Sequence, residues 1–281
     1  MVDGMELELS ELGKKSDYLT QYDASLLFPI PRLIKREELG LSQKVNFSGV
    51  DIWSSFEISW LNSKGKPEVR VGVFEISSDS ENIIESKSFK LYLNSFNNTK
   101  FHSESEVTAL MKSDLSQAAN GEVIVRLIKL SEYDCTFVNG FSGVNLDVLD
   151  VEINEYMTNP SLLKCASELI VEETLTSDLL KSNCLVTNQP DWGSVMISYK
   201  GAQIDHESLL KYIISFRDHN EFHEQCVERI YTDIMKHCQP EKLLVYARYT
   251  RRGGLDINPL RSSLSELEID EALKNLRLVR Q

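Results

Sequence analysis

The feature that most constrains the fold of this chain is a weak internal repeat at an offset of 120 residues. Two similar amphipathic segments, SFKLYLNSF from Ser88 and SLLKYIISF from Ser208, each follow a strand-like stretch and precede a second helical segment. We infer a duplicated unit of β-hairpin, two helices and β-hairpin, although chance agreement between two amphipathic helices is the alternative. The matched pairs are Ser88 and Ser208, Tyr92 and Tyr212, Ser95 and Ser215, Phe96 and Phe216, and Val125 and Val245.

Hydrophobic patterning predicts the same order of elements in both halves. Residues 1–40 are polar and are expected to form a loop. The expected strands cover 50–60, 69–76, 122–130, 194–202 and 242–250, and the expected helices cover 83–96, 106–119, 207–216 and 224–238.

Composition and charge exclude several classes of protein. Of the 281 residues, 42% are hydrophobic and 26% charged, so the chain can bury a core and is not a disordered polymer. With 30 Lys and Arg against 43 Asp and Glu, the formal net charge is −13, and no basic run offers the cationic face that a nucleic-acid backbone requires. We therefore expect no nucleic-acid partner.

Several observations favour a cytoplasmic protein. No stretch of 18 apolar residues occurs, which predicts no membrane-spanning helix and no membrane partner. The N-terminal sequence lacks a basic start followed by an apolar segment, so it does not resemble a secretory signal. The five cysteines are odd in number and scattered, and we interpret them as reduced thiols.

One cysteine lies where it could act as a nucleophile. Cys184 stands in the polar, turn-forming segment NCLVTNQPDWG, and Asp191 follows seven residues later, after a Gln-Pro turn. Such a turn can bring the carboxylate beside the thiol to accept its proton, which activates the sulfur. The alternative is an ordinary loop cysteine. The other cysteines fall in helical or strand patterns, which is typical of small core residues.

His219 and His223 are four residues apart and would share one face of a helix. A zinc-peptidase pattern needs Glu directly after the first His, whereas Asn220 stands there, and no usual zinc spacing links the histidines to the cysteines. We therefore expect no metal. Two interpretations remain: a polar helix start, or hydrogen bonding by His223 and Glu224 to a guanine-like heterocycle.

Positive side chains occur in segments suited to phosphate. Lys87 and Lys90 are three residues apart near the start of an expected helix, and a further pair of positive side chains, Arg251 and Arg252, precedes Gly253 and Gly254. Helix N-termini, clustered lysines and Arg-Gly turns favour anionic oxygens, although solvated basic turns are more common. No GxGxxG follows a strand, so neither a Rossmann nucleotide site nor a P-loop is indicated.

Four separated motifs, taken in order, resemble one protein family. They are ESKSFKLY from Glu85, C-x-x-x-N-Q-P-D from Cys184 to Asp191, FHE from Phe222, and RGG from Arg252. The chain resembles the NADPH-dependent 7-cyano-7-deazaguanine reductases, the QueF nitrile reductases of queuosine biosynthesis, in their long two-module form. The resemblance covers essentially the whole chain.

The resemblance implies a fold and a reaction. The family has the tunnelling fold, in which ββααββ units pack side by side and bind planar substrates at their junctions. We therefore expect an α+β chain of two tandem duplicated tunnelling modules with antiparallel sheets, 1–155 and 156–281, with substrate sites where the halves or two chains meet, and a homodimer. The implied reaction is the four-electron reduction of the nitrile to 7-aminomethyl-7-deazaguanine, with NADPH used twice and with no flavin or metal.

The resemblance also implies roles for the matched residues. Cys184 would add to the nitrile carbon to give a covalent thioimide, and Asp191 would move the protons. Many relatives carry Pro where this chain has Arg251, so only Arg252 is assigned to the coenzyme, and His219 is left as structural. The deazapurine is expected to contact Ile84, Glu85, Ser86, Phe222, His223 and Glu224. NADPH is expected to contact Ser86, Lys87, Lys90, Arg252 and Gly253.

Two other classes of function stay open. A pterin- or GTP-processing hydrolase of the same fold would need a zinc site built from Cys and His. A non-catalytic binding module would lack a nucleophile such as Cys184.

Overall fold

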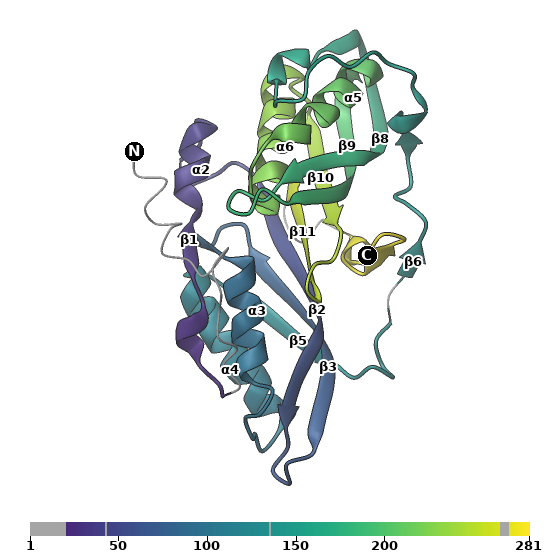
Figure 1. Cartoon of the computed structure of the whole chain (residues 1–281). Helices are drawn as coiled ribbons and strands as arrows, with labels where there is room; N and C mark the ends of the chain where they lie inside the picture. The colour runs from purple at the N-terminus through teal and green to yellow at the C-terminus, as the bar shows by residue number, and fades with distance from the viewer. Residues whose placement is uncertain (1–20, 43, 135, 265–269) are drawn as a thin grey trace. The chain divides into compact units, whose positions relative to one another are not determined.

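The computed structural model of the chain describes residues 21–42, 44–134, 136–264 and 270–281. It divides into two compact units, each of which combines helices with mainly antiparallel strands (Figure 1). The first unit comprises the described residues of Met1–Val45, Asp51–Asp134 and Arg252–Asp256, and the second comprises those of Asn46–Val50, Cys135–Arg251 and Ile257–Gln281.

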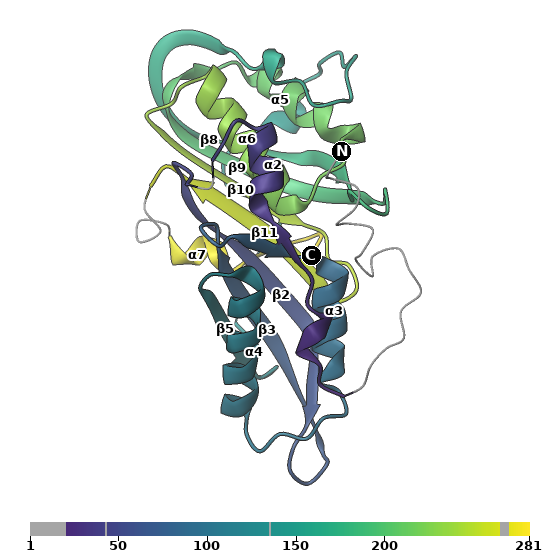
Figure 2. The ribbon, with the colours of Figure 1, turned by 90° about the vertical axis from the view of Figure 1, so that its left-hand side faces the viewer.

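The sheet of the first unit has the strand order β5-β3-β2. The expected long hairpin is formed by β2 (Ser48–Leu61) and β3 (Pro67–Ser77), and β5 (Val123–Ile128) pairs antiparallel with β3. Helices α3 (Ser86–Ser95) and α4 (Glu104–Ala119) cover one face of these strands (Figures 1 and 2). Both helices were predicted, and they place the ESKSFKLY motif at the start of α3.

Aromatic side chains join α3 to the sheet. The Phe89 ring lies 5.0 Å from the ring of Trp53 on β2 and 5.0 Å from that of Phe74 on β3. All three side chains are fully buried, and edge-to-face aromatic contacts of this kind stabilise a core beyond the area that they bury. The start of α3 therefore rests on a rigid support.

The segment before β2 is more regular than the sequence indicated. Residues 1–20 lie outside the described part, but the expected loop over residues 21–40 is wrong. This segment contains η1 (Ala24–Leu26), β1 (Pro29–Pro31) and α2 (Arg32–Glu38), and β1 pairs antiparallel with β4 (Asn82–Ile84). The prolines suggested a loop, yet a short edge strand tolerates them, and α2 buries arginines instead of an apolar stripe.

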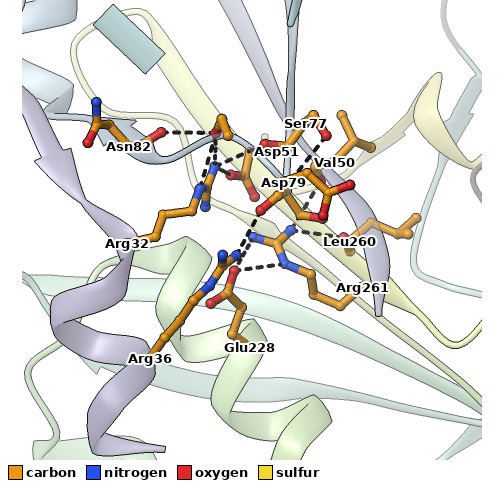
Figure 3. A network of polar contacts seen from close by, with 12 residues as sticks. Arg32, Arg36, Val50, Asp51, Ser77, Asp79, Asn82, Glu228, Leu260 and Arg261 are labelled. Atoms are coloured by element: carbon orange, nitrogen blue, oxygen red, sulfur yellow. Dashed lines mark hydrogen bonds and ion pairs between the residues drawn. The ribbon is translucent and has the colours of Figure 1, made fainter. Parts of the chain in front are cut away.

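Those arginines form buried polar contacts (Figure 3). Arg32 is 2% exposed, and its Nη2 atom lies 2.5 Å from Oδ2 of Asp51, which is 1% exposed. Arg36 donates from Nη2 to the carbonyl oxygen of Ser78 at 2.8 Å. Because a charge without a partner is costly in a low-dielectric interior, the carboxylate of Asp51 is needed where α2 is buried.

The second unit contains a sheet in the order β11-β10-β9-β8-β7. Its long antiparallel hairpin consists of β8 (Cys165–Asn183) and β9 (Pro190–Ile204). Strand β10 (Lys242–Tyr249) pairs antiparallel with β9 and with β11 (Leu255–Ser262), and β7 (Val144–Asn145) pairs parallel with β8.

Helices and short elements complete the second unit. Helices α5 (His206–Ile214) and α6 (His223–His237), both predicted, pack on β8 and β10, respectively. None of the described helices is long and apolar enough to cross a membrane. The short elements are β6 (Thr136–Val138), η2 (Leu146–Val148), η3 (Pro160–Leu162), η4 (Ser215–Asp218), α7 (Glu271–Lys274) and β12 (Leu276–Leu278), which pairs parallel with β6.

Strands β8 and β11 were absent from the sequence-based prediction. The first half of β8 is largely exposed and carries several Glu residues, and its pairing with β9 is interrupted between Cys165 and Ile170 and between Ser177 and Leu180. These features disturb the alternation of polar and apolar residues that identifies a strand. β11 contains a proline, which argues against a strand when read from sequence alone.

The hydrogen bonds around α3 recur around α5. The Tyr92 hydroxyl donates to Oδ2 of Asp114 at 2.7 Å, and the Tyr212 hydroxyl donates to Oδ2 of Asp233 at 2.6 Å. Both helices begin at an acidic cap, Glu85 or Asp205. In each unit two serine hydroxyls bond back to carbonyl oxygens three residues earlier: Ser88 to Glu85, Ser95 to Tyr92, Ser208 to Asp205 and Ser215 to Tyr212.

The buried contact between Arg32 and Asp51 predicts a large loss of stability on substitution. Asp51→Ala removes a buried carboxylate that pairs with the buried guanidinium of Arg32 and should lower the free energy of unfolding by about 3–5 kcal/mol. The control is Glu132→Ala, which removes the carboxylate of an exposed pair with Lys129 and should cost about 0–1 kcal/mol. Urea unfolding followed by tryptophan fluorescence compares the two, and equal midpoints would contradict this expectation.

Candidate active site

The hairpin of β8 and β9 carries the cysteine singled out from the sequence. The last pair of the ladder is Asn183 opposite Pro190. Two backbone hydrogen bonds close the loop: Cys184 donates to the carbonyl of Gln189 at 2.8 Å, and Asn188 donates to the carbonyl of Cys184 at 3.0 Å. Asn188 has a φ of 56°, which asparagine tolerates better than most residues. Cys184 is therefore the first residue of a tight loop, where its side chain is partly exposed.

The strand register brings Asp191 to the same end of the hairpin. Asp191 lies directly opposite Ser182, and it is 5% exposed. Pairing continues to Asn183 opposite Pro190, so Cys184 directly follows the last paired residue of β8, and Asp191 directly follows the first residue of β9. The turn predicted between the two residues is this hairpin loop.

A second segment of the chain is fixed beside the end of β8. The Asn183 N–H donates to the carbonyl of His219 at 2.8 Å, and the Glu221 N–H donates to the carbonyl of Asn183 at 3.1 Å. The amide nitrogen of Asn220 donates to the carbonyl of Cys184 at 3.2 Å. These bonds hold the residues that precede α6 against the cysteine loop.

An ion-pair cluster anchors this second segment. Glu221 is 1% exposed and receives two hydrogen bonds from Arg229, at 2.7 and 3.0 Å. The Nε2 atom of His219 lies 3.0 Å from the same carboxylate. Burial alone would raise the pKa of Glu221, but the bonds to His219 and Arg229 outweigh it and leave the pKa below its usual value. The negative charge is thus retained, and His219 is occupied by this cluster.

His223, at the start of α6, makes the contact that places it beside Asp191. Its Nε2 atom lies 3.2 Å from Oδ1 of Asp191, and the two side chains are 14% and 7% exposed. The imidazole ring stacks on the ring of Tyr249 from β10, with centroids 3.8 Å apart and an interplanar angle of 3°. Tyr249 was missed from the sequence, because no motif spacing links the strand YARYT to a histidine.

The two neighbours of His223 differ in exposure. Phe222 immediately precedes α6 and is partly exposed, whereas Glu224 is 3% exposed in the first turn. The FHE motif therefore offers an aromatic surface, an imidazole and a buried carboxylate at one end of a helix. A planar heterocycle with N–H groups could use all three kinds of contact.

The environment of Cys184 differs from that of two other cysteines. Burial, together with nearby negative charge, raises the pKa of the Cys226 thiol well above its usual value, and burial beside Cys165 raises the pKa of Cys238 to about 12. A raised pKa disfavours the thiolate, which is the nucleophilic form of cysteine. Cys165 is partly exposed, and Cys135 lies outside the described residues. Cys184 alone of the four described cysteines lies in the loop that adjoins the Asp191–His223 pair.

In the first unit, Glu85 caps helix α3. Its two carboxylate oxygens accept the N–H groups of Lys87 and Ser88, each at 2.8 Å, and the side chain is 1% exposed. Burial raises the pKa of Glu85 above its usual value, although the two N–H bonds oppose this shift. Ile84, just before the cap, is buried, and Ser86 is partly exposed.

Lys90 links α3 to the RGG turn within the first unit. Its ammonium donates to the carbonyl of Gly253 and lies 3.1 Å from Oε2 of Glu57. Arg252 and Leu255 exchange two backbone hydrogen bonds, of 2.8 and 3.0 Å, across the two glycines. Gly253 and Gly254 have φ values of 55° and 79°, which such a two-residue turn requires and glycine adopts without strain. The structure thus brings together Lys90, Gly253 and, unforeseen, a carboxylate.

No arrangement for a metal was found. Among the described residues, no group of three or more His, Cys, Asp and Glu side chains could hold an ion. His219 and His223 do not share a helix face, because α6 begins only at His223. The two histidines were expected to share a face only if a helix contained both, and of these two α6 contains only His223.

Comparison with known proteins identifies relatives over nearly the whole chain. A family model described as "Nitrile reductase, 7-cyano-7-deazaguanine-reductase N-term" matches residues 18–127, and one described as "QueF-like protein" matches residues 190–267. Three similar curated proteins are each named NADPH-dependent 7-cyano-7-deazaguanine reductase. Their identities and coverages are 58% for Hydrogenovibrio crunogenus (97% of this chain, 96% of the relative), 60% for Cupriavidus metallidurans (91% and 94%) and 57% for Cupriavidus pinatubonensis (98% and 99%).

Proposed function

The chain belongs to the family of NADPH-dependent 7-cyano-7-deazaguanine reductases, and we propose that it reduces the nitrile of its substrate through a covalent thioimide on Cys184. The reaction converts 7-cyano-7-deazaguanine to 7-aminomethyl-7-deazaguanine, a precursor in queuosine biosynthesis. The observation that carries the mechanism is the β8–β9 hairpin, whose end carries both Cys184 and Asp191, the residue that contacts His223.

The first step adds the thiol to the nitrile. The sulfur of Cys184 bonds to the nitrile carbon, the thiol proton leaves, and the nitrile nitrogen gains a proton, so the thioimide contains every atom of both reactants. Asp191, held 3.2 Å from His223, accepts the thiol proton and returns one to the nitrogen, with the imidazole as its hydrogen-bonded partner. A protonated thioimide is a better hydride acceptor than a free nitrile.

Two reductions complete the reaction. NADPH supplies one hydride in each. The first reduction, with one proton, gives a thiohemiaminal, which releases the Cys184 thiol and leaves an imine. The second, with another proton, gives the amine. The chain must shield the imine from water, because imines hydrolyse.

We propose that Phe222, His223 and Glu224 contact the deazapurine. The partly exposed Phe222 suits stacking on the planar base, and the buried Glu224 suits its N–H groups. His223 lies beside the proposed proton-transfer group Asp191, so a base bound to it would have its nitrile close to Asp191.

A second set of residues is also assigned to the deazapurine: Ile84, Glu85 and Ser86. Each oxygen of Glu85 accepts one backbone N–H, and Oε1 also accepts the hydroxyl of Ser86 at 3.4 Å. A carboxylate oxygen has room for a second donor, so Oε2 of Glu85 can accept an N–H group of the base without uncapping α3.

NADPH is assigned to the start of α3 and the RGG turn. Ser86 and Lys87 occupy the first turn of the helix, and Lys90 contacts Gly253 in the turn that begins at Arg252. Cationic side chains beside backbone N–H groups suit the 2′-phosphate of the coenzyme. Lys90 would exchange its contact with the exposed Glu57 for a phosphate oxygen.

We also propose that the chain consists of two tandem tunnelling modules, 1–155 and 156–281. The hydrogen bonds that recur around α3 and α5 support a duplication. We propose a homodimer without metal, flavin, nucleic-acid or membrane partners. A reduced nucleophilic thiol fits the cytoplasm.

The covalent step predicts an adduct without coenzyme. Mixing the protein with 7-cyano-7-deazaguanine alone should increase its intact mass by that of the substrate, with the modification on Cys184. Cys184→Ala should form no adduct, whereas Cys165→Ala, which removes another partly exposed thiol, should form it normally. Absence of an adduct on the unsubstituted protein would rule out the thioimide.

The coenzyme assignment predicts a selective loss of NADPH affinity. Lys87→Ala should raise the Kd for NADPH about tenfold or more, because it removes a charge-assisted contact to phosphate, and should leave the Kd for 7-cyano-7-deazaguanine within about twofold. Lys112→Ala, an exposed lysine on α4, is the control. Isothermal titration measures both ligands, and equal effects on the two would exclude this role for Lys87.

A further inference from the structure

Tyr249 has an unusual set of neighbours for a core aromatic residue. Its side chain is completely buried, and its ring lies parallel to the imidazole of His223 at a centroid distance of 3.8 Å. Stacking of two flat rings fixes the plane of each against rotation. The plane of the His223 ring decides whether Nε2 points toward Asp191, so Tyr249 controls that contact.

The ring of Tyr249 also packs closely on the neighbouring strand. Tyr249 on β10 lies directly opposite Gly193 on β9. A Cβ atom at Gly193 would lie 3.2 Å from both Cδ1 and Cε1 of the tyrosine, and 3.4 Å from Leu180. The absence of a side chain at Gly193 therefore leaves room for the Tyr249 ring, and a methyl group at this position would crowd that ring.

Side-chain amides hold the backbone of Tyr249. Its N–H donates to Oδ1 of Asn258 at 3.2 Å, and its carbonyl accepts from Nε2 of Gln281 at 3.1 Å. Gln281 Nε2 also donates to Oδ1 of Asn258 at 2.8 Å, and Arg248 Nε donates to Oε1 of Gln281 at 2.5 Å. The side chains of Arg248, Asn258 and Gln281, together with the backbone of Tyr249, form what we call the amide clamp.

On the β11 side of β10, the amide clamp replaces the backbone pairing that is found earlier in the strand. The register of β10 with β11 runs from Leu244 to Tyr246. At Tyr249 the side chains of Asn258, which is completely buried, and Gln281 bind the backbone polar groups instead. An amide side chain can donate and accept at once, so substitution of either residue removes several of these bonds together.

We propose that Tyr249, Asn258 and Gln281 are positioning residues for the proton-transfer pair of Asp191 and His223. The clamp fixes the backbone of Tyr249, the tyrosine ring fixes the plane of the imidazole, and the imidazole keeps Nε2 beside the carboxylate. The proposal rests on the proposed function, because it assigns Asp191 and His223 to the reaction. Its consequence is a role in turnover for Gln281, a residue far from every motif in the sequence.

Two tyrosine substitutions test the stacking step. Tyr249→Leu removes the flat surface and should lower kcat about 100-fold, with KM for both substrates within about threefold. Tyr249→Phe retains the ring and should keep kcat within about threefold of the unsubstituted protein. The control is Tyr231→Leu, which removes a different buried tyrosine ring, located on α6, that packs on Phe47 at 5.2 Å; it should lower Tm but leave kcat unchanged.

Two glutamine substitutions test the clamp and do not depend on a buried cavity. Gln281 is partly exposed, so Gln281→Glu should fold even if Tyr249→Leu does not. A carboxylate can still accept from Arg248 but cannot donate to Tyr249 or Asn258, and kcat should fall about tenfold with KM unchanged. Gln281→Asn, which keeps an amide oxygen and an amide NH2 on a shorter side chain, should recover part of this loss.

The outcomes separate this proposal from the proposed function. If the unsubstituted protein forms no adduct and oxidises no NADPH, the function itself fails. If it is active and Tyr249→Leu or Gln281→Glu has an unchanged kcat, the positioning role is overturned. It is also overturned if the loss appears only in KM, or if Tyr231→Leu lowers kcat as much as Tyr249→Leu, since loss of packing alone would then explain it.

Discussion

The pairing of β8 with β9 up to Asn183 and Pro190 is the constraint on which the second unit's chemistry depends. The ladder fixes where the loop begins, so it fixes Cys184, and the same register places Asp191 opposite Ser182. The backbone of Asn183 bonds on its other side to His219 and Glu221. Backbone hydrogen bonds at this end of the hairpin therefore hold the main chain at Cys184, at Asp191 and at the segment that precedes α6.

Buried polar groups keep these elements in a single arrangement. The Glu221 carboxylate with Arg229 and His219 holds the segment before α6. Elsewhere in that unit, Arg261 lies completely buried with its Nη2 atom 3.0 Å from Glu228 (Figure 3). Such pairs add little net stability over an apolar core, but breaking one leaves a costly unpaired charge. Glu228 and Arg229 both belong to α6, so breaking either pair would disturb the helix that carries the proposed site residues His223 and Glu224.

Sequence patterns predicted what depends on local order along the chain. The Gln-Pro pair between Cys184 and Asp191 predicted a turn, although not the strand β8 that precedes it, and the 3.6-residue periodicity predicted helices α3, α4, α5 and α6. The contact of His223 with Asp191, the stacking on Tyr249 and the clamp by Gln281 depend instead on strand register and on residues distant in the sequence. Strand β8 was not predicted for a related reason. It is exposed, acidic and irregular, and its extended conformation depends on pairing with β9.

The central claim is that the hairpin delivers Asp191 as the group that moves the thiol proton, and the rate of covalent capture tests it most directly. Single-turnover mixing with 7-cyano-7-deazaguanine, without NADPH, measures adduct formation on Cys184 by quenched mass spectrometry. Asp191→Asn keeps the shape of the side chain and removes its basicity, so the rate should fall at least about 100-fold. An unchanged rate of adduct formation in Asp191→Asn would contradict this role for the carboxylate.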